Sequence, residues 1–165
     1  YEEHDLYIDW GKEPCDFIKE MTGYSSKRMK DEGIRPDEAY KYFSSYLRDP
    51  EYIVTGHNIL GLDVPLERLW AKAIGYEHEY DYLNRLIDTL CLAKSYRFDR
   101  PPDKKDFLIC QFKISKEYTR NMKCKLSDLG KEFEIDFDPN MLHNSLYDVK
   151  LNLNVLKQLL WKVEL

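Results

Sequence analysis

The sequence predicts an α/β or α+β domain in which helices pack on a small sheet. Stretches of strand character fall in the first third of the chain, and amphipathic helices follow. With 165 residues, of which 43% are hydrophobic and 33% charged, the chain has the size of one domain and can bury a core. That balance argues against disordered, collagenous and low-complexity proteins. We therefore treat residues 1–165 as a single domain.

The first predicted elements are short. Residues 5–10 (DLYIDW) alternate apolar and acidic side chains, which favours a strand, and a loop with a short helix follows over 21–34. Residues 35–38 (RPDE) place proline and acidic side chains where the first turn of a helix favours them. Residues 52–55 (YIVT) predict a buried strand that stops at Gly56. The helix that opens at 35–38 should pack through Ala39, Tyr42, Phe43, Tyr46 and Leu47.

Helices dominate the rest of the chain. We expect them over 65–74, over 86–96 and, as a short one, over 125–133, whereas 99–123 is the least regular stretch. A last helix over about 145–162 should bury apolar side chains spaced three and four residues apart, namely Val149, Leu153, Leu156, Leu160 and Val163.

Charge is unevenly distributed along the chain. The net charge is −5, but residues 94–125 contain ten Lys or Arg and four Asp or Glu, an excess of +6 that leaves −11 for the remainder. An acidic body with a basic sector is compatible with binding a nucleic-acid backbone beside a carboxylate metal site. The alternative interpretation of the basic sector is a solvated, lysine-rich loop.

Cysteine usage and hydropathy narrow the class of protein. The four cysteines lie far apart and form no CxxC pair, so a zinc site is unsupported, and Cys91 in its apolar stretch is typical of a small core residue. No apolar run reaches the ~18–20 residues that cross a bilayer, and no signal peptide is visible. We expect no membrane partner and an intracellular location, cytoplasmic or in the nucleoid or nucleus, with reduced thiols.

Two aspartates and a histidine lie where chemistry is favoured. Asp63 ends the segment GHNILGLD (56–63), after a predicted buried strand and at the start of a helix, where α/β folds bind ligands. Asp148 lies one turn into the last helix, five residues after His143 in HNSLYD (143–148). Carboxylates suit Mg²⁺ or Mn²⁺, and histidine can take a proton from water near neutral pH. Taken singly, such an aspartate is more often a helix cap and such a histidine more often a surface residue.

Taken together and in this order, these segments resemble the DEDDh 3′–5′ exonucleases, a ribonuclease H-like family that includes bacterial proofreading subunits. The resemblance covers nearly the whole chain, from the TGY segment (22–24) through GHNILGLD, IDTL (87–90) and KLSDLGKEF (125–133) to HNSLYD. It implies a ribonuclease H-like fold with a small mixed sheet flanked by helices. It also implies metal-dependent hydrolysis of the terminal phosphodiester at single-stranded DNA or RNA 3′ ends.

The sequence departs from the motifs of the family in two places. The second motif has six steps from His57 to Asp63 instead of five, and Leu62 replaces an aromatic residue, so GHNILGLD is also similar to the second motif of family-B polymerase proofreading domains. The His143 of the third motif favours the DEDDh type. The family's first motif, a strand carrying Asp-x-Glu, does not occur before Thr22. We expect one or two strands that carry it to lie upstream, which makes the domain N-terminally incomplete.

The resemblance implies roles for particular residues. Asp63 and Asp148 would be ligands of a two-metal site holding Mg²⁺ or Mn²⁺, and His143 would be the general base. Asp88 would support the site from outside the metal ligands, or cap a helix. The residues implied at the substrate are Asn58, Thr22, Gly23 and Tyr24, the tyrosine by stacking on a base.

Two function classes follow. The first is an active 3′–5′ exonuclease whose partners are a single-stranded nucleic-acid 3′ end and a polymerase, replication or repair protein. The second is a catalytically incomplete nucleic-acid-binding or scaffolding domain derived from such an enzyme. A helical interaction domain with coincidental motifs is a third reading, and it would place Asp63, His143 and Asp148 far apart.

Overall fold

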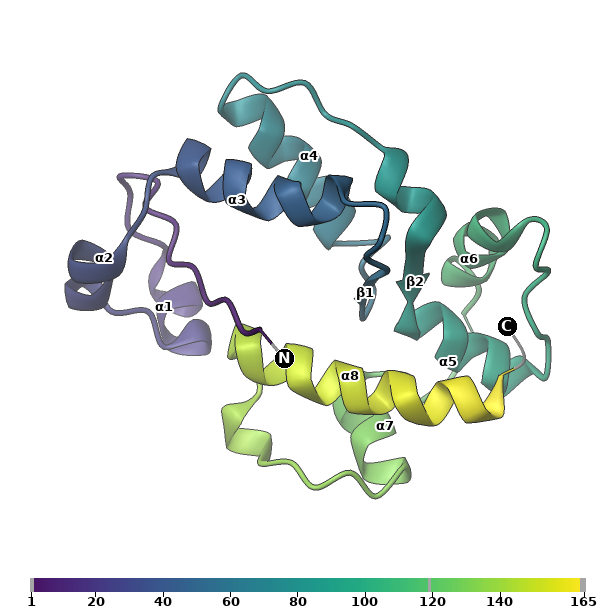
Figure 1. Cartoon of the computed structure of the whole chain (residues 1–165). Helices are drawn as coiled ribbons and strands as arrows, with labels where there is room; N and C mark the ends of the chain where they lie inside the picture. The colour runs from purple at the N-terminus through teal and green to yellow at the C-terminus, as the bar shows by residue number, and fades with distance from the viewer. Residues whose placement is uncertain (1, 119, 164–165) are drawn as a thin grey trace.

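A computed structural model describes residues 2–118 and 120–163 (Figure 1). Residue 1 and residues 164–165 of the predicted domain, together with Thr119 of the predicted irregular stretch 99–123, lie outside the described residues. Within that part of the chain the architecture is mixed α/β, with helices around a small sheet. The helices are α1 (Asp16–Thr22), α2 (Ser26–Glu32), α3 (Pro36–Arg48), α4 (Asp63–Ala73), α5 (Thr89–Phe98), α6 (Phe107–Ser115), α7 (Leu126–Glu132) and α8 (Ser145–Lys162), with 3-10 turns at Asp81–Arg85 and Pro139–Met141.

The sheet of the described residues consists of two parallel strands. Strand β1 (Val54–Gly56) pairs with β2 (Leu86–Asp88), so that Val54 lies opposite Leu86. Helix α4 lies in the crossover between them, as parallel strands require. The resemblance implied a mixed sheet, and the pairing found here is parallel.

Backbone groups at the outer edge of β2 are satisfied by a side chain from α6. Gln111, which is 1% exposed, accepts a hydrogen bond from the Asp88 N–H through Oε1 (2.7 Å) and donates through Nε2 to the Leu86 carbonyl (3.0 Å). A neighbouring strand would make the same two kinds of bond. Gln111 therefore closes this edge of the sheet.

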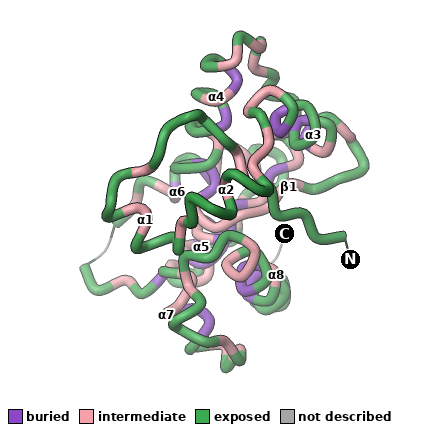
Figure 2. Tube along the Cα trace, turned by 90° about the vertical axis from the view of Figure 1, so that its left-hand side faces the viewer, coloured by how far each residue is buried: buried purple, intermediate pink, exposed green. Residues whose placement is uncertain are grey.

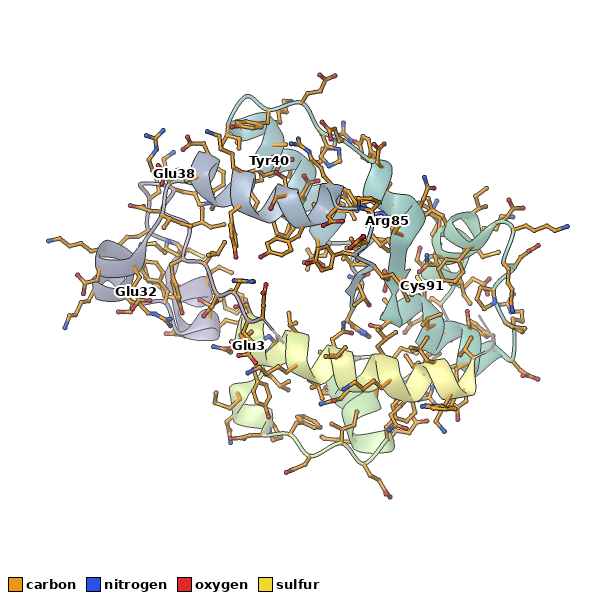
Figure 3. All side chains as sticks on the ribbon, viewed as in Figure 1. Glu3, Glu32, Glu38, Tyr40, Arg85 and Cys91 are labelled. Carbon is orange, nitrogen blue, oxygen red and sulfur yellow. The ribbon has the colours of Figure 1, made fainter. Side chains whose placement is uncertain are left out.

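One arginine joins the two chain segments that lead into β1 and β2. Arg85 (Figure 3) precedes β2, and its guanidinium donates to the carbonyl of Leu47 at the end of α3 (2.6 Å) and to that of Tyr52 before β1. The two connections that lead into the strands are therefore held together.

Two groups of apolar side chains form the core. One lies where α5 and α7 pack against α8, and the other lies between the strands, α3, α5 and α6. Cys91 (Figure 3) is 1% exposed in the second group, which confirms its predicted core position, and burial raises the pKa of its thiol. Helices α1 and α2 contribute no buried residue and are exposed in Figure 2.

Several predicted elements are present and others differ. Helices α3, α4, α7 and α8 lie where they were expected. Strand β1 is present but covers Val54–Gly56, so Tyr52 and Ile53 lie before it and are exposed, and the strand is half-buried where a buried one was expected. The strand expected at 5–10 was wrong, because that segment forms a single parallel bridge between Ile8 and Ile34. The helix expected from 86 begins at Thr89, since residues 86–88 are β2, so strands are not confined to the first third of the chain. Helix α6 was missed inside 99–123.

The buried faces of two helices also differ from expectation. In α3, Ala39 and Leu47 are buried as expected, but Tyr42 and Phe43 are exposed and Tyr40 is buried instead. In α8, Leu156 and Val163 are buried, whereas Val149 (62%) and Leu160 (45%) are exposed. Apolar residues surround most of α8, so periodicity alone does not decide which of its faces turns inward. Contacts with α5 and α7 select a face of α8 that contains Leu151, Asn152, Val155 and Leu159.

We predict that Gln111→Leu lowers the free energy of unfolding by about 2–4 kcal/mol, because each buried backbone group left without a partner costs about 1–3 kcal/mol. Urea unfolding followed by circular dichroism measures this change. Gln158→Leu, at an exposed position of α8, is the matched control and should stay within about 0.5 kcal/mol of the wild type. Equal stabilities of the two variants would contradict the role of Gln111.

Candidate functional site

A buried carboxylate organises the C-terminal ends of both strands. Asp88 is 1% exposed and accepts three backbone N–H groups: from Asn58 (2.9 Å) and Leu60 (3.1 Å) of the loop after β1, and from Leu90 in the first turn of α5 (2.9 Å). It therefore caps α5 and fixes the loop 57–62 at the same time. The bond to Leu90 confirms the predicted helix cap, and the support of a metal site from outside its ligands stays a prediction.

The loop after β1 turns sharply. Asn58 has a positive φ of 62°, and its carbonyl accepts from the N–H groups of Gly61 (3.0 Å) and Leu62 (2.9 Å). A Cβ at position 61 would lie 2.5 Å from Asn58 Oδ1, so a larger residue there would displace the Asn58 side chain. The turn lies within the segment from His57 to Asp63. It also gives Asn58 a structural role beside the predicted substrate contact.

A polar chain connects the loop to α5 and α8. His57 Nδ1 lies 3.0 Å from Thr89 Oγ1, and that hydroxyl lies 2.6 Å from Oδ1 of Asn152, a buried residue of α8. Burial lowers the pKa of His57, and the nearby Asp88 charge and the backbone of Cys124 offset part of this effect. His57 is therefore favoured in its neutral form near pH 7.

His143 and Asp148 lie together at the start of α8. Asp148 Oδ2 accepts the backbone N–H of His143 (3.2 Å), and His143 adopts a positive φ of 73°. Asp148 Oδ1 is buried and has no hydrogen-bond partner among the described residues. Burial raises the pKa of Asp148, and the His143 backbone and charge oppose that rise. His143 itself is exposed to solvent.

Asp63 is the first residue of α4 and lies on the surface. Desolvation by the surrounding chain raises the pKa of its carboxyl, and the negative charge of Asp88 adds to the rise. It stands at one end of a mostly apolar cavity of about 550 Å³ whose walls include Trp10, Phe43 and Trp70.

The segment Thr22–Tyr24 ends α1. The Thr22 hydroxyl donates to the Ile18 carbonyl (2.7 Å), Gly23 adopts a left-handed conformation, and the Tyr24 N–H donates to the Lys19 carbonyl (3.1 Å). These bonds make the segment a helix C-cap, in which the positive φ favours glycine. Their predicted role beside a terminal nucleotide stays a prediction.

The described residues do not make up a metal centre. Within 2–118 and 120–163, no three His, Cys, Asp or Glu side chains are grouped closely enough to hold a metal ion. The unpartnered Asp148 oxygen suits a cation, but the complete donor set that Mg²⁺ or Mn²⁺ needs is not assembled there. Asp63, His143 and Asp148 remain predicted site residues, of which the structure brings the last two into contact.

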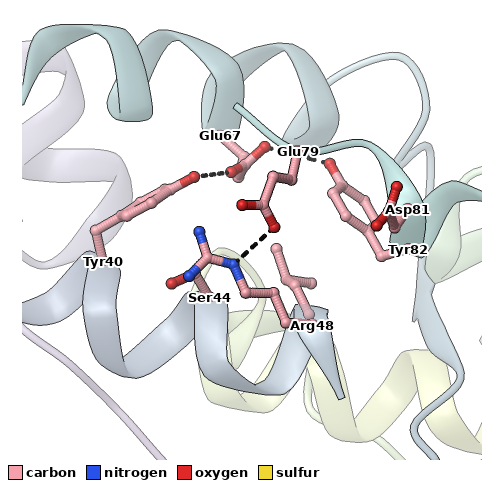
Figure 4. Close-up of a pocket in the computed structure, with 8 residues that line it drawn as sticks. Tyr40, Ser44, Arg48, Glu67, Glu79, Asp81 and Tyr82 are labelled. Atoms are coloured by element: carbon pink, nitrogen blue, oxygen red, sulfur yellow. Dashed lines mark hydrogen bonds and ion pairs between the residues drawn. The ribbon is translucent and has the colours of Figure 1, made fainter. Parts of the chain in front are cut away.

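Sequence reasoning missed a second polar cluster, which lies between α3, α4 and the segment 78–82 (Figure 4). Glu67 is buried and accepts from the hydroxyls of Tyr40 (2.5 Å) and Tyr82 (3.2 Å), while His78 Nε2 pairs with the same carboxylate. Burial and the Glu67 charge raise the pKa of both tyrosines, Tyr40 and Tyr82. The cluster borders a cavity of about 240 Å³. Both tyrosine hydroxyls donate to Glu67, and these bonds hold α4 against α3 and the segment 78–82.

In comparisons with known proteins, no family model, curated protein or solved structure matches the chain. In the part of the chain that the structure describes, none of the helices has the length and apolar character needed to span a bilayer.

We predict that Asp88→Asn destabilises the fold by on the order of 2–4 kcal/mol, because the amide offers one acceptor oxygen and turns a donor toward buried N–H groups. Urea unfolding measures the loss, and hydrogen exchange should accelerate at the amides of Asn58 and Leu60. The control is Asp49→Asn, since Asp49 caps an exposed turn through the Glu51 N–H (2.9 Å). Slow exchange at both amides in Asp88→Asn would contradict the proposed role.

The lowered pKa of His57 predicts a pH dependence. The unfolded chain binds a proton at His57 near the ordinary pKa of 6.5, before the folded chain does. The contribution of His57 to stability therefore falls as the pH drops from about 6.5 through the lower folded pKa. As the pH falls from about 7 to about 5, the free energy of unfolding should decrease less for His57→Gln than for the wild type. Histidine NMR titration checks the folded pKa, and a value above 6.5 would overturn the prediction.

Proposed function

We propose that this chain acts in a metal-dependent 3′–5′ exonuclease of the DEDDh type, with a ribonuclease H-like fold and single-stranded 3′ ends of DNA or RNA as substrate. The observation that carries the proposal is the geometry of Asp148. One of its carboxylate oxygens holds the segment of His143, and the other is buried without a partner. A buried oxygen of this kind is rare unless a cation, proton or water satisfies it.

The free edge of β1 supports the same proposal. Parallel sheets are normally buried on both faces, and isolated two-stranded sheets are marginal. Gln111 occupies the outer edge of β2, and no described strand pairs with the other edge of β1, whose three residues are all half-buried. We propose that a further strand, from polypeptide outside these 165 residues, pairs with β1 and supplies the carboxylates that the donor set lacks.

Each predicted site residue then has a limited task. Asp63 and Asp148 would belong to the metal site, which provides the charge needed at the scissile phosphate when it is complete. His143, exposed beside Asp148, would take a proton from the attacking water. Asn58 would hold the loop that leads to Asp63, through the turn that its carbonyl forms.

A specific observation favours a second function, a catalytically incomplete nucleic-acid-binding or scaffolding domain. Among residues 2–118 and 120–163 no metal-binding group is formed. Under this alternative the unpartnered Asp148 oxygen binds a proton or water, and no catalytic step takes place.

The first test uses the 165-residue chain with a 3′-labelled single strand and Mn²⁺. We expect it to cleave slowly or not at all, because Mg²⁺ and Mn²⁺ need preorganised carboxylates before they give up water. Rapid cleavage by this chain alone would refute the requirement for a further strand.

The second test uses the complete natural polypeptide that contains these residues. Under the exonuclease proposal the 3′ label is released stepwise, Asp148→Ala abolishes release, and His143→Ala slows it by roughly 10²–10⁴-fold, as expected for a general base. Asp31→Ala, at an exposed position of α2, controls for the loss of a charge. Tight binding of the strand without any release would instead support the non-catalytic alternative.

A further inference from the structure

We infer that the cavity between the end of β1, α5 and residues 116–118 and 120–126 is a subsite for an unstacked base and phosphate of single-stranded nucleic acid. The inference rests on the proposed function and adds a contact surface that the predicted site residues, Asn58 apart, do not form. The cavity measures about 380 Å³ and lies within the size range of about 300–1,000 Å³ that is usual for ligand pockets.

The lining of the cavity suits a flat, partly polar ligand. Its apolar walls come from Leu90, Met122 and Leu126, and the amide of Asn58 lies at its edge. An amide side chain offers both a donor and an acceptor, the combination that the edge of a base requires. Tyr118 also lines the cavity and is 84% exposed, so its ring can stack on a base without leaving a packed position.

Positive charge at the cavity is not neutralised. Lys94 Nζ donates to the backbone carbonyls of Ser115 (2.7 Å) and Glu117 (2.8 Å), and these bonds hold the connection while leaving the ammonium charge in place. The carboxylate of Glu117 pairs with Arg100. Lys125 is exposed at the start of α7, and none of the described acids forms an ion pair with it.

The neighbouring charges agree with an anionic occupant. His57 also lines the cavity, and burial lowers the pKa of its imidazole, so it is favoured in its neutral form and the positive charge comes from the lysines. The connection that follows carries further exposed cations, Arg120 and Lys123. A phosphate beside Lys125 and a base against Tyr118 would satisfy the charge and the exposed ring together. A purely apolar ligand would leave Lys125 without an anion.

The test measures binding and needs no catalysis. Fluorescence anisotropy follows labelled oligothymidylate and oligouridylate of about twelve nucleotides binding to the 165-residue chain, within the usual site size of about 4–16 nucleotides. Tyr118→Ala should weaken binding by about five- to hundredfold, the loss expected for one stacked base. Tyr118→Phe, which keeps the ring, should restore it. Trp161→Ala removes a 90%-exposed aromatic ring on α8 and should leave binding unchanged.

Salt dependence provides an independent readout for the phosphate. Lys125→Ala should reduce the slope of log affinity against log salt by about 0.7, the value for one contact with a single strand. Lys72→Ala, at an exposed position of α4, should leave the slope unchanged.

The outcomes separate the two proposals. If the wild type binds either strand and both Tyr118→Ala and Lys125→Ala bind equally well, the cavity is not a subsite, and the proposed function is unaffected. If the folded wild type binds neither strand, the subsite and the nucleic-acid function both fail.

Discussion

The buried carboxylate of Asp88 is the interaction on which the arrangement of the central elements depends. A carboxylate removed from water must be matched by donors, and here three backbone N–H groups from two separate segments supply them. Satisfying this one charge fixes where β1 ends, how the following loop turns and where α5 begins. The neighbouring Thr89 then joins the same region to α8 through Asn152. The positions of Asn58, Asp63 and Asp148 all follow from that framework.

Local patterns predicted the elements whose signals are strong and self-contained. The Pro-Asp-Glu start of α3, the β-rich run that stops at Gly56 and the long apolar periodicity of α8 each indicated their element correctly. The run LID at 86–88 is too short for periodicity to distinguish a strand from a helix, and its pairing with β1 decides the outcome. Residues 5–10 show the converse, because a strand pattern without a partner strand leaves only one bridge.

The candidate site was harder to predict because its contacts join residues far apart in the sequence. The HNSLYD motif predicted site roles for His143 and Asp148, and the structure adds a hydrogen bond from the His143 backbone to the Asp148 carboxylate. Gln111 and Glu67 gave no comparable signal, since a glutamine and a glutamate on helices are most often solvated. Their roles emerge only when folding brings Leu86, Tyr40 or His78 beside them. The donors that a metal would require must likewise come from separate segments that folding brings together, and no single motif contains them all.

The glutamine that covers β2 has a consequence for solubility. An uncovered strand edge is a template on which other chains can add strands, and proteins commonly protect such edges against aggregation. Because Gln111 saturates the Leu86 carbonyl and the Asp88 N–H within the same molecule, this side of the sheet cannot recruit a foreign strand. Because Leu86, Asp88 and Gln111 are each 1% exposed, this edge also lies beneath α6, and an incoming strand would have to displace that helix before it could pair.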